Sequence, residues 1–235
     1  NSGYDPKQES SYVNRMLTLG ADGFIIQPTP GFHETSKLIT DLKKPFVYFD
    51  SKVYEDASFW VKTDNYTATH KAMQELIARG YQNFLMIGAD PSKLSTRIER
   101  SSGFIDCITE SGLSFQSLEI RDGEINHAEI LSFVKRNLKD TEATLVYVPN
   151  CWALPEVCDA LQSLRDLIPQ KLGIIGFDNT EWASFSSPRI TTIVQPAYAE
   201  GQKAAEILID QIEEKYEEKS HQMLKCSVHW SESTL

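Results

Sequence analysis

The sequence contains no long hydrophobic run and no recognisable targeting segment. None of its apolar stretches approaches the roughly 20 residues that a membrane-spanning helix needs. The start of the chain, NSGYDPKQES, lacks both the basic region and the apolar region of a secretory signal peptide. We therefore expect a cytoplasmic protein that has no membrane partner.

Cysteine is sparse in this chain. The four cysteines, Cys107, Cys151, Cys158 and Cys226, form no CxxC pair and lie within apolar or helical patterns. This usage is typical of reduced, mostly buried thiols in a cytosolic protein. The spacing also argues against a zinc site, and we expect no metal.

Positive charge is in deficit. Lys and Arg number 23 against 33 Asp and Glu, which gives a formal net charge of −10 and a sequence pI near 5.0. Nucleic-acid binding needs clustered Lys and Arg that displace counterions from the phosphates. Any contact with DNA is therefore expected to come from residues outside this sequence.

The motifs of the common catalytic mechanisms are also missing. There is no GxSxG elbow, no GxxxxGK[ST] phosphate loop, no GxGxxG after a strand and no HExxH. A lone histidine is far more often a surface or core residue than a catalyst, and the five here are scattered: His33, His70, His127, His221 and His229. We expect neither enzyme activity nor a cofactor.

The sequence does contain a regular alternation of predicted helices and strands. A chain of 235 residues with 41% hydrophobic residues is long enough for one large domain or two small ones. Periodicity and Gly/Pro stops predict about seven strands alternating with about seven helices, joined by short connections. This pattern indicates an α/β fold with parallel sheets. Three of the predicted elements are a helix Leu154–Leu167, a helix from Ala197 to about Tyr216 and a last strand Met223–Trp230.

Two segments, Lys62–Asn65 and Thr192–Pro196, are predicted to connect two lobes. Each is an extended piece with turn-forming residues that leads into a helix. The predicted domains are residues 1–62 plus 195–222 for an N-terminal lobe and residues 63–194 plus 223–235 for a C-terminal lobe. Small-molecule sites are common at such domain interfaces, so a binding cleft is expected between the lobes.

The stretch Gly173–Pro196 carries the strongest candidate for a binding residue. The apolar run Leu172–Phe177 is typical of a buried parallel strand, and Asp178 follows where that strand ends. Ligands of open α/β sheets bind at this carboxyl edge. A carboxylate there can accept hydrogen bonds from two neighbouring hydroxyls of a polyol. Asp50 and Asp64 follow strands in the same way, although Asp64 could equally cap the next helix.

Three further polar or aromatic residues complete the candidate site. Arg100 offers a rigid fork of donors, with a surface role or replacement by Arg97 as the competing interpretations. Asn150 brings both a donor and an acceptor at another strand end. Trp152 offers an aromatic face for sugar C–H groups, but it could equally serve in packing.

A family resemblance covers essentially the whole chain. The matching segments, in order, are GADGFIIQP, KPFVYFD, TDNYTATHKAMQELIARGYQNFLMIG, RSSGF, LGIIGFDNTEWASFSSPRITTIVQP and SESTL. With them the chain resembles the effector-binding region of the LacI/GalR family of bacterial transcriptional regulators. The resemblance implies a fold similar to type I periplasmic sugar-binding proteins, with two lobes joined by three crossover strands and an N-terminal lobe that is incomplete at its start.

The resemblance also implies roles for individual residues. Asp178 in GFDN and Arg100 in RSSGF match residues that face the effector. Further implied effector contacts are Asn150, Asp50, Gln195 and, more weakly, Gln27. The implied hinge or crossover residues are Asp64 and Thr192. The family usually has Asn-Asp where this chain has Asn150-Cys151-Trp152, so we hypothesise that Trp152 adds a ring to the pocket.

The resemblance implies an effector-sensing, dimerising module. A sugar or related small molecule would bind between the lobes and control operator DNA binding through an N-terminal helix-turn-helix headpiece. That headpiece, a hinge helix and the first part of the N-terminal lobe are expected to precede the point that matches Asn1. An extracytoplasmic sugar-binding protein of a transport system is the alternative, and an enzyme ranks third.

Overall fold

The computed structural model describes residues 2–3, 5–29, 31–52, 59–121, 124–215 and 221–235. The chain divides into two compact units. Unit 1 comprises residues 1–64, 93–96 and 196–225, and unit 2 comprises residues 65–92, 97–195 and 226–235. The domain bounds expected from the sequence remain a prediction.

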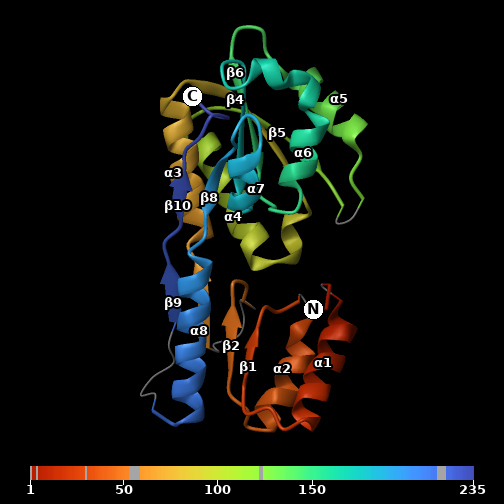
Figure 1. Ribbon diagram of the computed structural model, residues 1–235, viewed down its shortest axis with the longest axis vertical. Coiled ribbons are helices and arrows are strands. Elements are labelled where there is room, and N and C mark those ends of the chain that lie inside the picture. The colour runs from red at the N-terminus through yellow and green to blue at the C-terminus, as the bar shows by residue number, and fades with distance from the viewer. Residues whose placement is uncertain (1, 4, 30, 53–58, 122–123, 216–220) are drawn as a thin grey trace. The chain divides into compact units, whose positions relative to one another are not determined.

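Unit 1 is built on a four-stranded parallel sheet with the strand order β1-β2-β3-β9 (Figure 1). Its strands are β1 (Phe24–Ile26), β2 (Phe46–Phe49), β3 (Phe59–Thr63) and β9 (His221–Leu224), and its helices are α1 (Pro6–Thr18), α2 (Phe32–Asp41) and α8 (Ala197–Ile212). Successive side chains of a strand face opposite sides of the sheet. Phe46 and Tyr48 accordingly pack with α1 and α2, whereas Val47 packs with α8.

Unit 2 is built on a six-stranded sheet with the order β10-β8-β7-β6-β4-β5, parallel except for β10, which runs antiparallel to β8. The strands are β4 (Tyr81–Gly88), β5 (Phe115–Glu119), β6 (Ala143–Val148), β7 (Leu172–Phe177), β8 (Thr191–Val194) and β10 (Ser227–His229). The helices are α3 (Asn65–Ala78), α4 (Ser95–Glu110), α5 (His127–Asn137), α6 (Leu154–Ala160) and α7 (Thr180–Phe185), with 3-10 turns at Pro91–Lys93 and Gln162–Leu167. The end of the first of these turns and the start of α4, residues 93–96, belong to unit 1.

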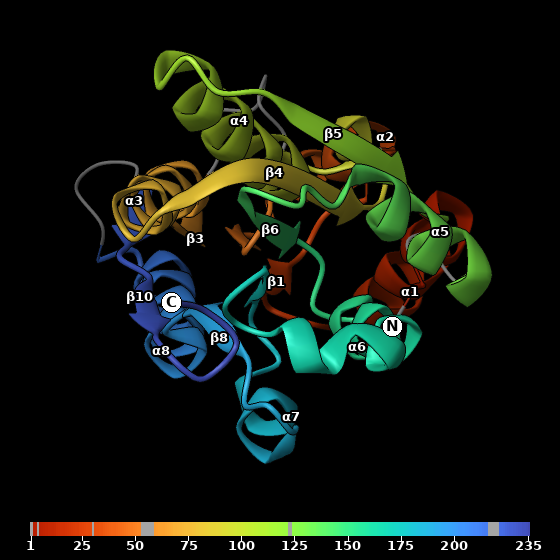
Figure 2. The same ribbon diagram turned by 90° about the horizontal axis from the view of Figure 1, so that it is seen from above.

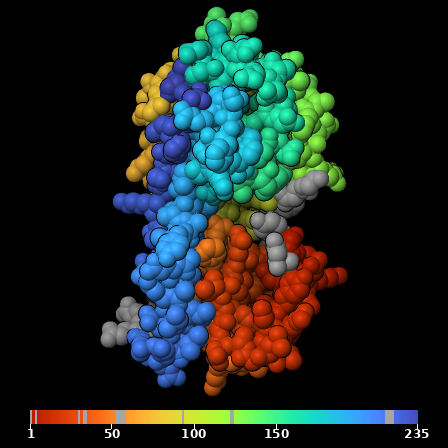
Figure 3. Space-filling view, in the orientation of Figure 1, coloured from red at the N-terminus to blue at the C-terminus, as the bar shows by residue number. Residues whose placement is uncertain are grey.

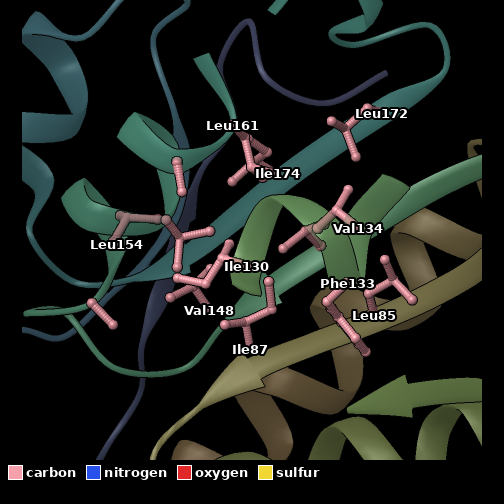
Figure 4. Close-up of a cluster of buried hydrophobic side chains, with 14 of the residues drawn as sticks. Leu85, Ile87, Ile130, Phe133, Val134, Val148, Leu154, Leu161, Leu172 and Ile174 are labelled. Atoms are coloured by element: carbon pink, nitrogen blue, oxygen red, sulfur yellow. The ribbon is translucent and has the colours of Figure 1, made fainter. Parts of the chain in front are cut away.

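Helices cover both faces of this second sheet. Residues of α3 and α4 pack on one face and those of α5 and α6 on the other (Figure 2). The cluster on the α5 and α6 face joins Leu85, Val148 and Ile174 of three strands to Val134 and Leu154 of the two helices (Figure 4). A parallel sheet that is buried on both faces requires near-continuous apolar strands, which explains the runs that made the strands predictable.

The predicted class, α/β with parallel sheets flanked by helices, is confirmed. Two element predictions are wrong. The expected last strand Met223–Trp230 is two strands in different sheets, because β9 pairs with β3 and β10 pairs with β8. The expected helix Leu154–Leu167 ends at Ala160 and continues only as a 3-10 turn. Helix α8 ends at Ile212, and its expected end, Tyr216, lies outside the described residues.

None of the helices in the described part of the chain combines the length and the hydrophobicity that a membrane span needs.

Candidate functional site

The candidate site lies at one edge of the sheet of unit 2. Strands β4, β6, β7 and β8 run parallel, so their carboxyl ends meet at the same edge. The residues that follow these ends are Ala89, Pro149 with Asn150, Asp178 with Asn179, and Gln195. This is the edge at which open α/β sheets bind ligands.

Arg100 of α4 donates hydrogen bonds to three segments that meet near this edge. Its Nε donates to Asn65 Oδ1 at 2.8 Å, its Nη1 to the Pro149 carbonyl at 3.0 Å and its Nη2 to Gln195 Oε1 at 3.0 Å. A guanidinium carries five N–H groups. These three bonds therefore leave two donors for another acceptor.

Arg100 is buried, and a phenyl ring covers its guanidinium. The side chain is only 7% exposed, and its Cζ lies 3.6 Å from the centre of the Phe177 ring. A guanidinium over an aromatic face is attracted by the ring quadrupole. Burying a charged group costs free energy unless the group is hydrogen-bonded, and here three neutral oxygens accept hydrogen bonds from the guanidinium. The interpretation of Arg100 as a surface residue is wrong, while the alternative Arg97 is buried as well.

Asp178 is held in an unusual backbone conformation. Its φ is 58° and that of Asn179 is 56°, in the left-handed region that non-glycine residues seldom adopt. The Asn179 side-chain amide donates to the Cys151 carbonyl at 3.1 Å, and Asp178 Oδ1 accepts from the Gln195 backbone N–H at 2.9 Å. The carboxylate is therefore fixed beside the residue that also binds Arg100. Strained residues of this kind cluster at binding sites.

Asn150 connects two strand ends. Its Oδ1 accepts from the Ala89 backbone N–H at 2.9 Å, and a Cβ at Gly88 would lie only 2.9 Å from the same oxygen. The residue is buried. Trp152 is half-buried and packs against the apolar cluster of the α5 and α6 face. Contacts of Asn150 and Trp152 with an effector remain predictions.

Two predicted residues of unit 1 also lie together. Gln27 follows β1 and donates through Nε2 to Asp50 Oδ2 at 2.6 Å, where Asp50 follows β2 with a φ of 62°. Asp64 follows β3, and its backbone N–H donates to the Leu224 carbonyl at 2.8 Å. Thr192 is buried in β8, and its hydroxyl has no hydrogen-bond partner among the described residues.

The sequence analysis placed Asn65 in a predicted connecting segment but not in the candidate site. The side chain is fully buried, and it binds Arg100 through Oδ1 and Glu99 through Nδ2 at 3.3 Å. Its position directly after Asp64, at the start of a helix, was the available signal. The prediction of mostly buried thiols is correct for Cys107 and wrong for Cys151, which is exposed.

The fold and the candidate site together define an α/β protein whose polar groups converge at the carboxyl edge of a parallel sheet. The chain belongs to the family described as periplasmic binding proteins and sugar-binding domain of the LacI family, whose profile matches residues 1–141. A second profile, described as periplasmic binding protein-like domain, matches residues 73–234. The resemblance inferred from the sequence motifs is thereby confirmed.

Known relatives are transcriptional regulators by name. The probable HTH-type transcriptional regulator EndR of Paenibacillus polymyxa is 29% identical over 229 residues, which cover 95% of this chain. The HTH-type transcriptional regulator KdgR of Bacillus subtilis is 26% identical over 217 residues, or 91% of this chain. The chain spans 66% and 63% of the lengths of these two relatives, slightly less than two thirds.

Solved structures share the fold. A periplasmic binding protein/LacI transcriptional regulator from Alkaliphilus metalliredigens, complexed with D-xylulofuranose, matches with a TM-score of 0.81 and 22% identity over 100% of this chain and 86% of its own. A LacI family regulator from Enterococcus faecium with bound ribose matches with a TM-score of 0.81 and 23% identity over 95% of this chain and 83% of its own.

Proposed function

We propose that this chain senses a sugar or a related small polar molecule for a LacI-type transcriptional regulator. The observation that carries the proposal is the convergence of Arg100, Asp178 and Gln195 at the carboxyl edge of the sheet of unit 2. The two remaining N–H groups of Arg100 and the fixed carboxylate of Asp178 present donors and an acceptor side by side. Vicinal hydroxyls of a sugar both donate and accept, so they match this set.

The ligands named for three solved structures of the same fold support a sugar as the effector. One is described with bound D-xylulofuranose, one with bound ribose and a third as a regulator in complex with cellobiose. On the strength of the family resemblance, we propose that Asn150, Trp152, Asp50 and Gln27 also contact the effector. In the same way we propose hinge roles for Asp64 and Thr192.

The proposed consequence of sugar binding is a change in operator DNA binding. With a net charge of −10, this chain is a poor match for DNA, so a basic headpiece elsewhere in the full-length protein would make that contact. An effector shifts such an equilibrium only through different affinities for the two states. We propose further that the protein is cytoplasmic and that it is not an enzyme. The alternative, a sugar-binding protein of a transport system, would have no operator.

The test of the sugar site is a substitution of its carboxylate. A thermal-shift screen of mono- and disaccharides and their phosphates selects a ligand, and calorimetry then measures its dissociation constant for the wild type and for Asp178→Ala. We expect at least about a tenfold weaker affinity, because a charged hydrogen bond contributes on the order of 1.5–3 kcal/mol. Asp140→Ala is the matched control, since Asp140 is exposed and precedes the opposite end of β6. An unchanged dissociation constant for Asp178→Ala would contradict the proposed sugar site.

We also propose a homodimer that uses the surface around α6 and α7. The α7 segment lies at the surface of unit 2 on the face shown in Figure 3, and its Phe185 is 82% exposed. Beside it lies a cavity of about 330 Å³ lined by Trp182, Leu161 and Ile190 among others. A two-fold interface needs one self-complementary surface, and an exposed ring next to an apolar hollow provides both halves of such a contact.

A further inference from the structure

Asn65 and Gln195 occupy corresponding places in the chain. Among the boundaries between the units, one leads from unit 1 to unit 2 between residues 64 and 65, and another leads from unit 2 to unit 1 between residues 195 and 196. Asn65 is thus the first residue of unit 2 at one passage, and Gln195 is the last residue of unit 2 at the other. Both side chains accept a hydrogen bond from the guanidinium of Arg100, at 2.8 and 3.0 Å.

Asn65 is fixed from both ends of its amide. Its Oδ1 accepts from Arg100 Nε and its Nδ2 donates to Glu99 Oε2, so it is held by two consecutive residues of α4. The residue is fully buried. Loss of this amide would leave a buried donor of Arg100 without an acceptor, which is costly in a closed environment.

Gln195 is fixed by both proposed sugar-binding residues. Its side-chain oxygen accepts from Arg100, and its backbone N–H donates to Asp178 Oδ1 at 2.9 Å. A guanidinium is planar and rigid, so its three hydrogen bonds cannot be changed independently. A displacement of Arg100 therefore disturbs Asn65 and Gln195 together.

We propose that Asn65 and Gln195 are positioning residues that couple the guanidinium of Arg100 to both of these chain passages. The coupling rests on the proposed function in one respect, namely that Arg100 contacts the effector. An effector that draws the guanidinium towards itself changes the hydrogen bonds at both passages in one step. Asn65 is then needed for the response as well as for the fold.

The first test needs no sugar. In protein labelled with ¹⁵N, solvent exchange is measured by NMR at the Arg100 Nε–H and at the Gln195 backbone amide. Asn65→Leu removes the acceptor of Arg100, so we expect exchange at both groups to rise by about tenfold or more. Asn65→Asp combined with Glu99→Gln keeps an oxygen for Arg100 and a hydrogen bond between positions 65 and 99, so this double variant should restore most of the protection.

Asn83→Leu is the matched control for lost stability. Asn83 is also a buried asparagine of unit 2, and its amide donates to the Asn137 carbonyl and to Thr144 Oγ1 near the start of β4. We expect this variant to leave the Arg100 and Gln195 exchange rates close to wild type. Unchanged exchange at Gln195 in Asn65→Leu, or an equal rise in Asn83→Leu, would overturn the coupling.

A second test uses D-ribose as the probe in a double-mutant cycle. Dissociation constants are measured for the wild type, Asn65→Leu, Arg100→Ala and the double variant. If Asn65 acts through Arg100, its substitution weakens ribose binding in the wild type but has little further effect in Arg100→Ala. Fully additive effects overturn the coupling and leave the sugar site standing. Ribose binding that is indifferent to Arg100 overturns the proposed site instead, and the exchange experiment still decides the coupling.

Discussion

At the scale of single residues, Arg100 shows how a charge is accommodated inside a protein with no carboxylate in direct contact among the described residues. Its three acceptors are an amide oxygen, a backbone carbonyl and a second amide oxygen, and a phenyl ring covers its face. Neutral oxygens satisfy the donors but do not neutralise the charge. Such a group retains the capacity to bind an oxygen-rich ligand, which a tightly paired arginine would not.

The cysteines provide a test at the same scale. Burial raises the pKa of the Cys158 thiol to about 12, and burial together with Glu110 raises that of Cys107 to about 11. Thiolate is the reactive form, so at pH 8 these thiols hold on the order of 100- to 1,000-fold less of it than an ordinary cysteine. We expect iodoacetamide to label the exposed Cys151 in the native protein and to spare Cys107 and Cys158, as read by peptide mass spectrometry.

The control for this labelling is the protein in urea, in which Cys107 and Cys158 should react like Cys151. Native labelling of Cys158 at the rate of Cys151 would contradict the assigned burial.

The raised pKa values of Cys107 and Cys158 also make the free energy of unfolding fall with pH. The stabilisation is complete below about pH 9, where unfolded thiols are protonated, and it is lost as pH rises through 11 to 12.

At the scale of elements, strand β7 and the loop after it position Asp178. The strand packs so closely on α6 that a Cβ at Gly176 would collide with the Leu154 side chain. Two left-handed residues then turn the chain at the sheet edge, and the Asn179 amide holds that turn against the loop after β6. Gly176, the second glycine in GIIGFDN, is therefore required by packing. The Asp-Asn pair is required by the left-handed backbone conformation of the turn.

Gly176→Ala tests this packing. We expect the free energy of unfolding to fall by about 1–3 kcal/mol, the usual cost of an extra methyl group in a filled core. Urea denaturation measures the change. Leu154→Val in the same chain should recover part of the loss, because it removes a methylene at the point of collision.

Gly201→Ala is the matched control for the glycine substitution. Gly201 lies in α8, where an added Cβ has no neighbour within 4 Å. Alanine is the better helix former, so this variant is expected to be up to about 1 kcal/mol more stable than wild type. Equal effects of the two alanines would show that packing against α6 is not what requires glycine at position 176.

At the scale of the whole molecule, the proposed dimer makes a distinct prediction. Phe185→Asp places a charge at the centre of the proposed interface, and we expect the protein to become monomeric by sedimentation velocity. Tyr198→Asp is the matched control, since Tyr198 is an equally exposed ring, at 87%, on α8 of unit 1. A dimer that survives Phe185→Asp, or one that Tyr198→Asp dissociates, would place the interface elsewhere.

Much of the architecture was predictable because its causes are local. Apolar runs ending in a polar residue identified Leu172–Phe177 and Asp178 before any contact was known. The last strand was mispredicted because the stretch Met223–Trp230 has one continuous extended pattern. Nothing in that pattern tells β9, which pairs with β3, from β10, which pairs with β8.

The sequence alone determined the α/β class, the family and the strand ends at which the candidate binding residues lie, because periodicity and motifs act over a few neighbouring residues. Only the tertiary structure decided what surrounds Arg100. Its three acceptors lie 35, 49 and 95 positions away along the chain, on three different segments. The packing of the whole unit brings these three acceptors together, and no local sequence pattern predicts them. For that reason Asn65 became a candidate only when the fold had brought it to the guanidinium.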